Sequence, residues 1–134
     1  MKMNQVTLGT TDFEASVAFY SMLGLIVIVH SPPRYARFEC PQGDEGGAPA
    51  TLSIHATEVV ADTEWPLVYF ETDRLDKDID RLRRAGVPIL SEPEDKDYLW
   101  READIADPAG NRIRLYTAGE NRRFPPWRVG SVAE

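Results

Sequence analysis

Short stretches of alternating apolar and polar residues run along most of the chain. Val6 and Leu8 alternate with polar neighbours, which predicts a half-buried strand over 3–9. Similar patterns predict further strands at 25–30, 34–40, 51–57, 87–91, 98–106 and 112–118. Two other segments place apolar side chains at helical spacing, first Phe13, Val17 and Tyr20, and later Leu75, Ile79 and Leu82. The pattern therefore predicts two amphipathic helices among many short strands.

Both predicted helices carry start and stop signals. Thr11 and Glu14 fit a capping box, in which two side chains accept hydrogen bonds from backbone N–H groups of the first turn. Asp73 can cap the second helix in a similar way. Gly24 and Gly86 are placed to end the helices, because glycine readily adopts the left-handed conformation found after a helix.

The two helices belong to an internal repeat. When the sequence is aligned with itself at an offset of 62 residues, the two apolar stripes coincide and Gly24 falls on Gly86. Each copy reads as a strand, a helix and three further strands, over about 3–57 and about 65–118. The repeat predicts an α+β fold of two tandem βαβββ modules.

The two modules are expected to pack together. A module of about 60 residues buries only a modest share of its surface and is marginal alone. We therefore predict one domain over residues 1–134, with a linker at 58–64 and a C-terminal tail at 119–134.

The composition and charge of the chain restrict the kinds of partner and the cellular location that are expected. The chain has 134 residues and a formal net charge of −7, which argues against binding to nucleic acid or to an anionic membrane surface. Its longest apolar run, Leu25–Val29, cannot span a bilayer, and Met1–Gln5 lacks the apolar stretch of a secretory signal. Cys40 is the single cysteine, so an internal disulfide is impossible. These features predict a cytoplasmic protein.

Three features resemble the vicinal oxygen chelate superfamily. They are the paired βαβββ pattern, the segment from Asp12 to Tyr20 before Leu23-Gly24-Leu25, and the ending from Asp107-Pro-Ala-Gly-Asn111 to Tyr116. That superfamily includes glyoxalase I, bleomycin-resistance proteins, fosfomycin-modifying enzymes and extradiol dioxygenases, and the resemblance covers roughly 3–118. The tail is similar to the ends of glyoxalase-like members. The resemblance implies curled mixed sheets that form a cup-shaped cavity.

Alternate residues of the strands give two candidate faces. One parity is apolar and is expected to face the helices. The other parity is polar or aromatic, and either meets water or lines the cup. Its aromatic content and the resemblance favour the cup. The predicted ligand-binding residues are Gln5, Tyr35, Arg37, Ser53, His55, Tyr69, Trp100, Asp104, Arg114 and Tyr116.

The resemblance also implies four positions for a divalent metal, and these hold Gln5, Ser53, Leu67 and Arg114. Only glutamine is a ready ligand, because leucine has no donor atom and arginine stays protonated. Serine is a poor ligand beside carboxylate and imidazole. We expect no metal at the usual positions and no other cofactor. The alternative is a relocated site built from His55, Glu71 and Glu102.

Three functions remain open from the sequence. The first is a metal-independent protein that binds a small organic molecule, with aromatic side chains stacking on the ligand and Glu71, Glu102 and Asp104 meeting cationic groups. The resemblance implies a homodimer for such a protein. The second is a metal-dependent lyase or dioxygenase in which Glu71 or Glu102 is the general base. The third is a dimerisation or sensor domain without catalysis.

The tail mixes basic and aromatic residues, namely Arg122, Arg123, Phe124, Trp127 and Arg128. It is interpreted either as a flap that closes a cup or grips a partner subunit, or as a segment docked on its own domain.

Overall fold

The computed structural model describes residues 2–41, 47–63 and 65–130. Within them the chain divides into two compact units. The first unit comprises the described residues up to Thr63 together with the turn 107–111, and the second unit comprises the rest. The prediction that the two modules form a single domain stays a prediction.

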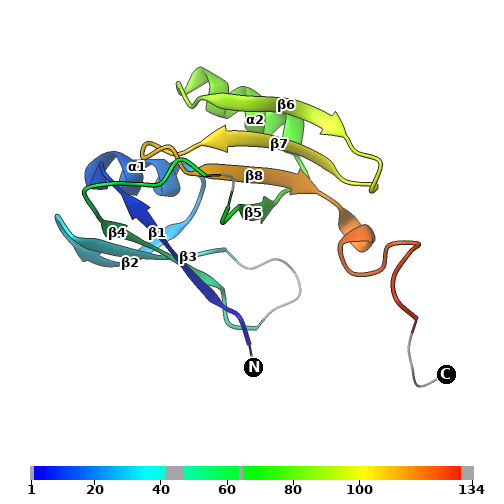
Figure 1. Cartoon of the computed structure of the whole chain (residues 1–134), viewed down its shortest axis with the longest axis horizontal. Helices are drawn as coiled ribbons and strands as arrows, with labels where there is room; N and C mark the ends of the chain where they lie inside the picture. The colour runs from blue at the N-terminus through cyan, green and yellow to red at the C-terminus, as the bar shows by residue number, and fades with distance from the viewer. Residues whose placement is uncertain (1, 42–46, 64, 131–134) are drawn as a thin grey trace. The chain divides into compact units, whose positions relative to one another are not determined.

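The first unit is a four-stranded sheet with one helix. Its elements are β1 (Gln5–Thr10), α1 (Phe13–Met22), β2 (Ile26–Ser31), β3 (Tyr35–Glu39) and β4 (Thr51–Ala56). The strand order is β1-β4-β3-β2, with β1 and β4 parallel and the other pairs antiparallel (Figure 1). The helix α1 packs on β3 and β4. The buried Phe19, Tyr20, Phe38, Leu52 and Ile54 form much of the core.

The turn 107–111 is held in the first unit by buried polar contacts. The Tyr20 hydroxyl donates to Asp107 Oδ2 over 2.7 Å, and Asn111 Nδ2 donates to the Gly9 carbonyl over 2.9 Å. Burial, reinforced by the Asp107 carboxylate, raises the pKa of Tyr20 above its usual range. The hydroxyl is therefore a permanent donor to this turn.

The second unit repeats this arrangement. Its elements are β5 (Val68–Glu71), α2 (Leu75–Arg84), β6 (Ile89–Asp95), β7 (Arg101–Ala106), β8 (Arg112–Thr117) and the short 3-10 helix η1 (Gly119–Arg122). The strand order is β5-β8-β7-β6, again with one parallel pair. Leu75, Ile79 and Leu82 of α2 are buried. The predicted α+β fold with two βαβββ modules is confirmed.

The repeat extends to the junctions between strand and helix. The Thr10 hydroxyl accepts a hydrogen bond from the Asp12 N–H and is hydrogen bonded to Ser16 over 2.7 Å. Sixty-two residues later, the Thr72 hydroxyl accepts from the Arg74 N–H and donates to Asp78 over 2.5 Å. In both units this threonine ties the end of the first strand to the first turn of the helix.

The glycines end the helices as predicted, but the predicted N-terminal caps were wrong. Gly24 and Gly86 have φ angles of 98° and 88°, in the left-handed region. The N-cap of α1 is Asp12 and not Thr11, and its carboxylate accepts from the Ala15 N–H. The N-cap of α2 is Arg74, which makes no side-chain cap, so Asp73 lies one residue too early.

Two boundaries in the second unit differ from the sequence prediction. The strand predicted over 87–91 ends too early, because β6 continues to Asp95 through Pro93. This strand is at the edge of its sheet and its register shifts between Ser91 and Glu94, and both settings tolerate a strand proline. Residues 98–100 precede β7 and belong to a turn.

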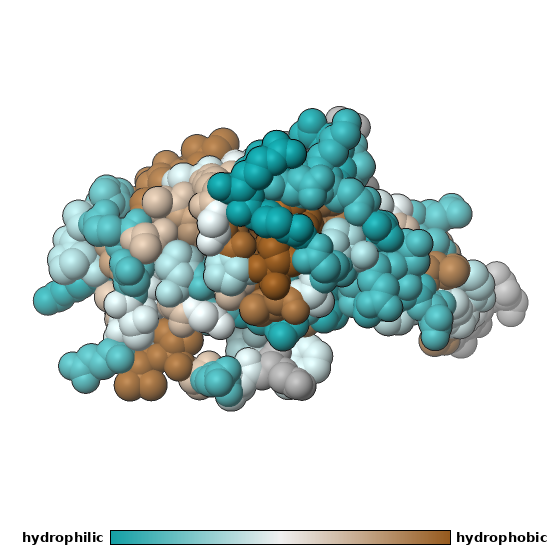
Figure 2. Space-filling model, turned by 90° about the horizontal axis from the view of Figure 1, so that it is seen from above, coloured by the Kyte–Doolittle hydropathy of each residue, from teal (hydrophilic) through white to brown (hydrophobic). Residues whose placement is uncertain are grey.

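The alternation along the strands separates two faces as predicted. Alternate apolar residues pack under the helices, and the most buried of them are Phe38, Ile54, Ala103, Ile105 and Ile113. The surface seen in Figure 2 is mainly hydrophilic, with apolar side chains gathered in separate patches. No helix among the described residues is long and apolar enough to cross a membrane.

Candidate functional site

The face of the second sheet that carries the alternate polar and aromatic residues brings several predicted site residues into two adjacent rows. The register aligns Tyr69 with Arg114 and Arg114 with Asp104 across β5, β8 and β7. The next row aligns Glu71 with Tyr116 and Tyr116 with Glu102. Side chains in register on neighbouring strands share a face, so six predicted residues meet on one surface.

Aromatic rings cover one part of this surface. Trp100 stacks on Tyr116 with ring centroids 4.5 Å apart and planes 15° from parallel. Tyr69 meets both rings edge-on, at 6.1 and 5.8 Å, and Tyr98 meets Trp100 edge-on at 6.0 Å. These are the favourable geometries for aromatic pairs, so the rings hold one another in place.

A tight turn positions Trp100. The Lys96 N–H donates to the Trp100 carbonyl over 2.7 Å, and the Leu99 N–H donates to the Lys96 carbonyl over 3.0 Å. Closing this turn places Leu99 at a φ of 67°, a left-handed conformation that costs a leucine about 1 kcal/mol or more. The Trp100 indole N–H also donates to the Asn121 carbonyl. The turn and the tail therefore fix the ring from two sides.

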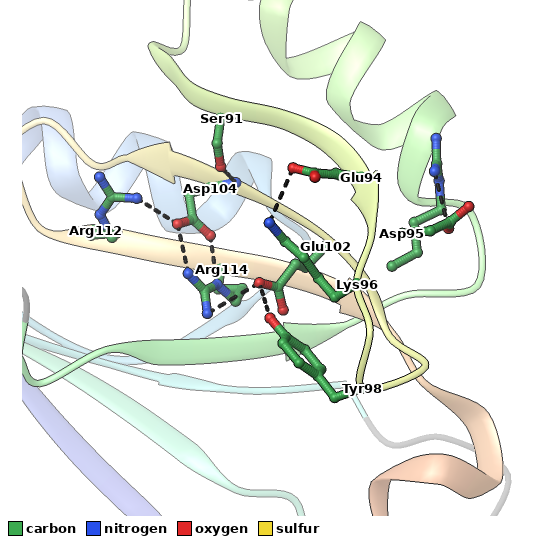
Figure 3. A network of polar contacts seen from close by, with 10 residues as sticks. Ser91, Glu94, Asp95, Lys96, Tyr98, Glu102, Asp104, Arg112 and Arg114 are labelled. Atoms are coloured by element: carbon green, nitrogen blue, oxygen red, sulfur yellow. Dashed lines mark hydrogen bonds and ion pairs between the residues drawn. The ribbon is translucent and has the colours of Figure 1, made fainter.

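Asp104 and Arg114 neutralise each other beside this aromatic cluster (Figure 3). Asp104 is 2% exposed and accepts from Arg114 Nε and Nη2, over 2.7 and 2.9 Å, as well as from Arg112. Burial by itself would raise the pKa of Asp104, but the hydrogen bonds from both arginines outweigh burial and hold that pKa below its usual range. Asp104 is therefore an ionised carboxylate whose oxygens are already bound.

Glu102 is bound at one oxygen only. Its side chain is 5% exposed, and Oε1 accepts from the Tyr98 hydroxyl over 2.5 Å and lies 3.3 Å from Arg114 Nη1. Burial and the Glu102 carboxylate raise the pKa of Tyr98 to about 12, so this hydroxyl stays protonated and donates. The other oxygen, Oε2, is the single buried side-chain polar atom among the described residues that has no hydrogen-bond partner.

These groups line a pocket of about 380 Å³ within the second unit. Its walls are Tyr69, Tyr98, Trp100, Glu102, Arg114, Asn121, Arg122, Pro125 and Trp127. A second hollow of about 490 Å³ shares Trp100 and Asn121 with it. The pocket thus combines aromatic rings, one incompletely bound carboxylate and the C-terminal tail.

The tail is anchored by Glu71. Its Oε2 accepts from the Ala118 and Gly119 N–H groups, over 3.4 and 3.3 Å, and its Oε1 lies 3.8 Å from Arg122 Nε. This carboxylate at the end of β5 therefore directs the chain after β8, and Pro125 and Trp127 then reach the pocket wall. Sequence reasoning did not place Tyr98, Asn121 or Pro125 in a site, although the aromatic content of the tail indicated that it docks.

The first unit holds the other predicted residues, and three of them, Tyr35, Arg37 and Ser53, are hydrogen bonded to one another. Register pairs Tyr35 with His55 and Arg37 with Ser53. The Tyr35 hydroxyl is hydrogen bonded to Ser53 over 2.7 Å and accepts from Arg37 Nε over 2.9 Å. These two contacts outweigh burial and lower the pKa of Tyr35. His55 is exposed, and Gln5 accepts from Thr51 at the strand edge.

The residues at the usual metal positions of the resembled superfamily do not fit a divalent cation. Leu67 offers no donor atom, the Ser53 hydroxyl is engaged with Tyr35, and Arg114 is bound to Asp104. In the alternative set, Glu71 and Glu102 flank Tyr116 from strands two apart, which separates their backbones by about 10 Å. Within the described ranges, no three His, Cys, Asp or Glu side chains are grouped to hold a metal ion.

Comparisons with known proteins agree with this fold. A glyoxalase/bleomycin resistance protein/dioxygenase from Nocardioides is 23% identical, with a TM-score of 0.70 over 97% of this chain and 90% of its own. Lactoylglutathione lyase from Agrobacterium tumefaciens is 20% identical, with a TM-score of 0.71 over 92% and 97% of the two chains.

TioX from Micromonospora sp. ML1 is 19% identical, with a TM-score of 0.66 over 88% of this chain and 99% of its own. A search of curated proteins finds no match. The sequence model of the Glyoxalase/Bleomycin resistance protein/Dioxygenase superfamily matches residues 2–115. The chain therefore belongs to the glyoxalase/bleomycin resistance protein/dioxygenase superfamily.

Proposed function

We propose that the protein binds a small planar organic molecule in the pocket of the second unit, without a metal ion. The observation that carries this proposal is the aromatic cluster beside a buried carboxylate that is bound at only one oxygen. A volume of about 380 Å³ lies within the range of small-molecule sites, which are apolar with a few well-placed polar groups.

Each wall of the pocket has a distinct role in this proposal. Trp100 lines the pocket and is held in place by its stack on Tyr116, and the more exposed rings of Tyr69 and Tyr98 offer surface for ligand stacking. Trp127 from the tail contributes a further ring. Arg114 lies over the Tyr69 ring at 5.5 Å and stiffens this wall, because Asp104 already holds its guanidinium.

The metal-dependent alternative requires a lyase or dioxygenase site at His55, Glu71 and Glu102. The contacts of Glu71 argue against it, because one of its oxygens is committed to two backbone N–H groups of the tail. Lactoylglutathione lyase activity, which one structural neighbour's name carries, is therefore the weaker proposal for this chain.

A homodimer in the cytoplasm remains part of the proposal. The resemblance to drug-binding relatives supports the dimer, and the single cysteine is compatible with a reducing compartment. Light scattering after size-exclusion chromatography tests the assembly: a mass near twice 15.1 kDa supports the dimer, and a monomer at all concentrations contradicts it.

Titration of the wild type with planar two-ring heteroaromatic compounds tests the binding proposal, with binding measured by calorimetry. Trp100→Ala is expected to weaken binding at least about tenfold, because it removes the stacked base of the pocket. Trp65→Phe is the matched control, since Trp65 is outside the residues that line the pocket, and it should bind like the wild type. Absence of binding to the wild type, or equal binding by Trp100→Ala, overturns the proposal.

A further inference from the structure

Three carboxylates face the same side of the second sheet, and they differ in how many of their oxygens already have hydrogen-bond partners. Asp104 accepts from two arginines at both oxygens. One oxygen of Glu71 accepts from backbone N–H groups of the tail, and the other oxygen is paired with Arg122. Glu102 is among the residues that line the pocket, and its buried Oε2 has no hydrogen-bond partner. Of the three, Glu102 is the carboxylate that has hydrogen-bonding capacity left for a ligand.

We infer that the ligand of this pocket is a cationic, amino-substituted heteroaromatic ring, and that one of its N–H groups donates a hydrogen bond to Glu102 Oε2. The inference rests on the proposed function and adds the chemical class of the molecule. A buried carboxylate oxygen without a donor is unfavourable in the empty pocket, and a ligand N–H removes that penalty.

The surroundings of Glu102 favour a cation over a neutral donor. Four aromatic side chains, those of Tyr69, Tyr98, Trp100 and Trp127, line the pocket, and the electron-rich faces of such rings attract cations. The two arginines of the lining offer little opposition, because Arg114 is bound to Asp104 and Arg122 pairs with Glu71. A carboxylate and several aromatic rings around one pocket are a combination that suits an ammonium or a protonated ring amine.

The contacts at Oε1 restrict the ligand further. That oxygen already accepts from Tyr98 and lies 3.3 Å from Arg114 Nη1. A guanidinium that needs both carboxylate oxygens side by side would have to displace the Tyr98 hydroxyl. A single N–H donor needs only Oε2. An aminated heteroaromatic ring therefore fits this carboxylate better than an arginine-like group.

Two matched probes test the inference by calorimetry at neutral pH. The first is 4-aminoquinoline, which is protonated and carries N–H donors, and the second is 4-methylquinoline, which has the same rings and is neutral. The wild type is expected to bind the amine at least about tenfold more tightly than the methyl compound, which corresponds to one charge-assisted hydrogen bond.

Glu102→Gln should remove this preference. Its amide oxygen can still accept from Tyr98, but an NH₂ group then replaces Oε2 and opposes the donor of the probe. Glu94→Gln is the matched control, because Glu94 is the exposed cross-strand neighbour of Glu102 and pairs with Lys96. This control should keep the tenfold preference. If Glu102→Gln does not fold, the probe pair on the wild type decides the question.

The outcomes separate the two proposals. Equal binding of both probes to the wild type, or an unchanged preference in a folded Glu102→Gln, overturns the cationic ligand and leaves the planar ligand standing. Failure of both probes and of every other planar compound to bind overturns the proposed function and this inference with it. A preference for the amine that only Glu102→Gln abolishes supports both.

Discussion

The two units have the same fold, but they differ in how the polar and aromatic face of their sheet is hydrogen bonded. Register places Tyr35 and His55 of the first unit where the second unit has Glu102 and Tyr116. It likewise places Arg37 and Ser53 where the second unit has Asp104 and Arg114, a buried ion pair. In the first unit the polar groups satisfy one another, whereas in the second unit one carboxylate oxygen is left over.

This difference shows which residues carry the repeat. The apolar face, the threonine at the end of the first strand and the glycine after the helix recur in both units. These groups determine the fold, because they form the core and the strand-to-helix junctions. The other face shares its backbone geometry and not its chemistry, so a binding site can be built in one unit without altering the scaffold.

The largest expected effect is a difference in lost stability between equivalent substitutions in the two units. Asp104→Asn is expected to lower the free energy of unfolding by about 3 kcal/mol, because it breaks a buried ion pair, removes the countercharge of Arg112 and leaves Arg114 with Glu102 alone. Arg37→Gln at the equivalent position of the first unit should cost less than about 1 kcal/mol, since Arg37 is only partly buried. Urea denaturation measures both, and equal losses would contradict this ranking.

The stability lost in Asp104→Asn should depend on pH through the protonation of the Asp104 carboxylate in the wild type. The pKa of Asp104 is lower in the folded protein than in the unfolded chain, so its contribution is complete above about pH 4 and is lost as the pH falls further. The wild type and Asp104→Asn should therefore approach each other in stability near pH 2. Urea titrations at neutral pH and near pH 2 measure the gap, and a constant gap would show that the carboxylate charge is not its source.

A smaller effect concerns the tail, a feature of the second unit only. Trp127 is 57% exposed and lines the pocket, so Trp127→Ala is expected to weaken probe binding about fivefold with little change in stability. Phe124→Ala is the control from the same segment, because Phe124 lies against Arg123 and Arg128 and outside the lining. Calorimetry with 4-aminoquinoline measures both variants. The interpretation fails if the two lose affinity equally.

The smallest expected effect concerns the turn before β7. Leu99→Asn should raise the free energy of unfolding by about 0.5 kcal/mol, because asparagine adopts a positive φ more readily and Leu99 is about half exposed. Urea denaturation is the measurement. A loss of stability would show that the apolar contacts of Leu99 outweigh its backbone strain.

The fold was accessible from the sequence because its signals are local and repeated. The helical spacing of Leu75, Ile79 and Leu82 and the glycines 62 residues apart predicted both modules. The strand predicted over 87–91 was too short because the tolerance of Pro93 in β6 depends on an edge position and a register shift, which only the assembled sheet shows.

The site was accessible only in part. Alternation along β7 and β8 placed Glu102, Asp104, Arg114 and Tyr116 on one face, and the register agrees. Their roles could not be ranked, because the availability of a carboxylate depends on hydrogen bonds such as those from Arg112 to Asp104 and from Tyr98 to Glu102. The contribution of Trp127 depends on the path of the tail, which Glu71 directs from another strand.

The edges of the two sheets have a consequence for handling the protein. The edge strand β6 carries Glu92, Pro93, Glu94 and Asp95, which discourage another chain from adding to it. The edge strand β2 has no charged or proline residue and exposes Ile26 and Ile28 at 55% and 44%.

Repulsion from the net charge of −7 opposes association through these edges in dilute buffer, but physiological salt screens it beyond about 8 Å. Concentrated samples in salt should therefore scatter more light as edges meet at β2, and a lysine in place of Ile28 should extend the concentration at which the solution stays clear.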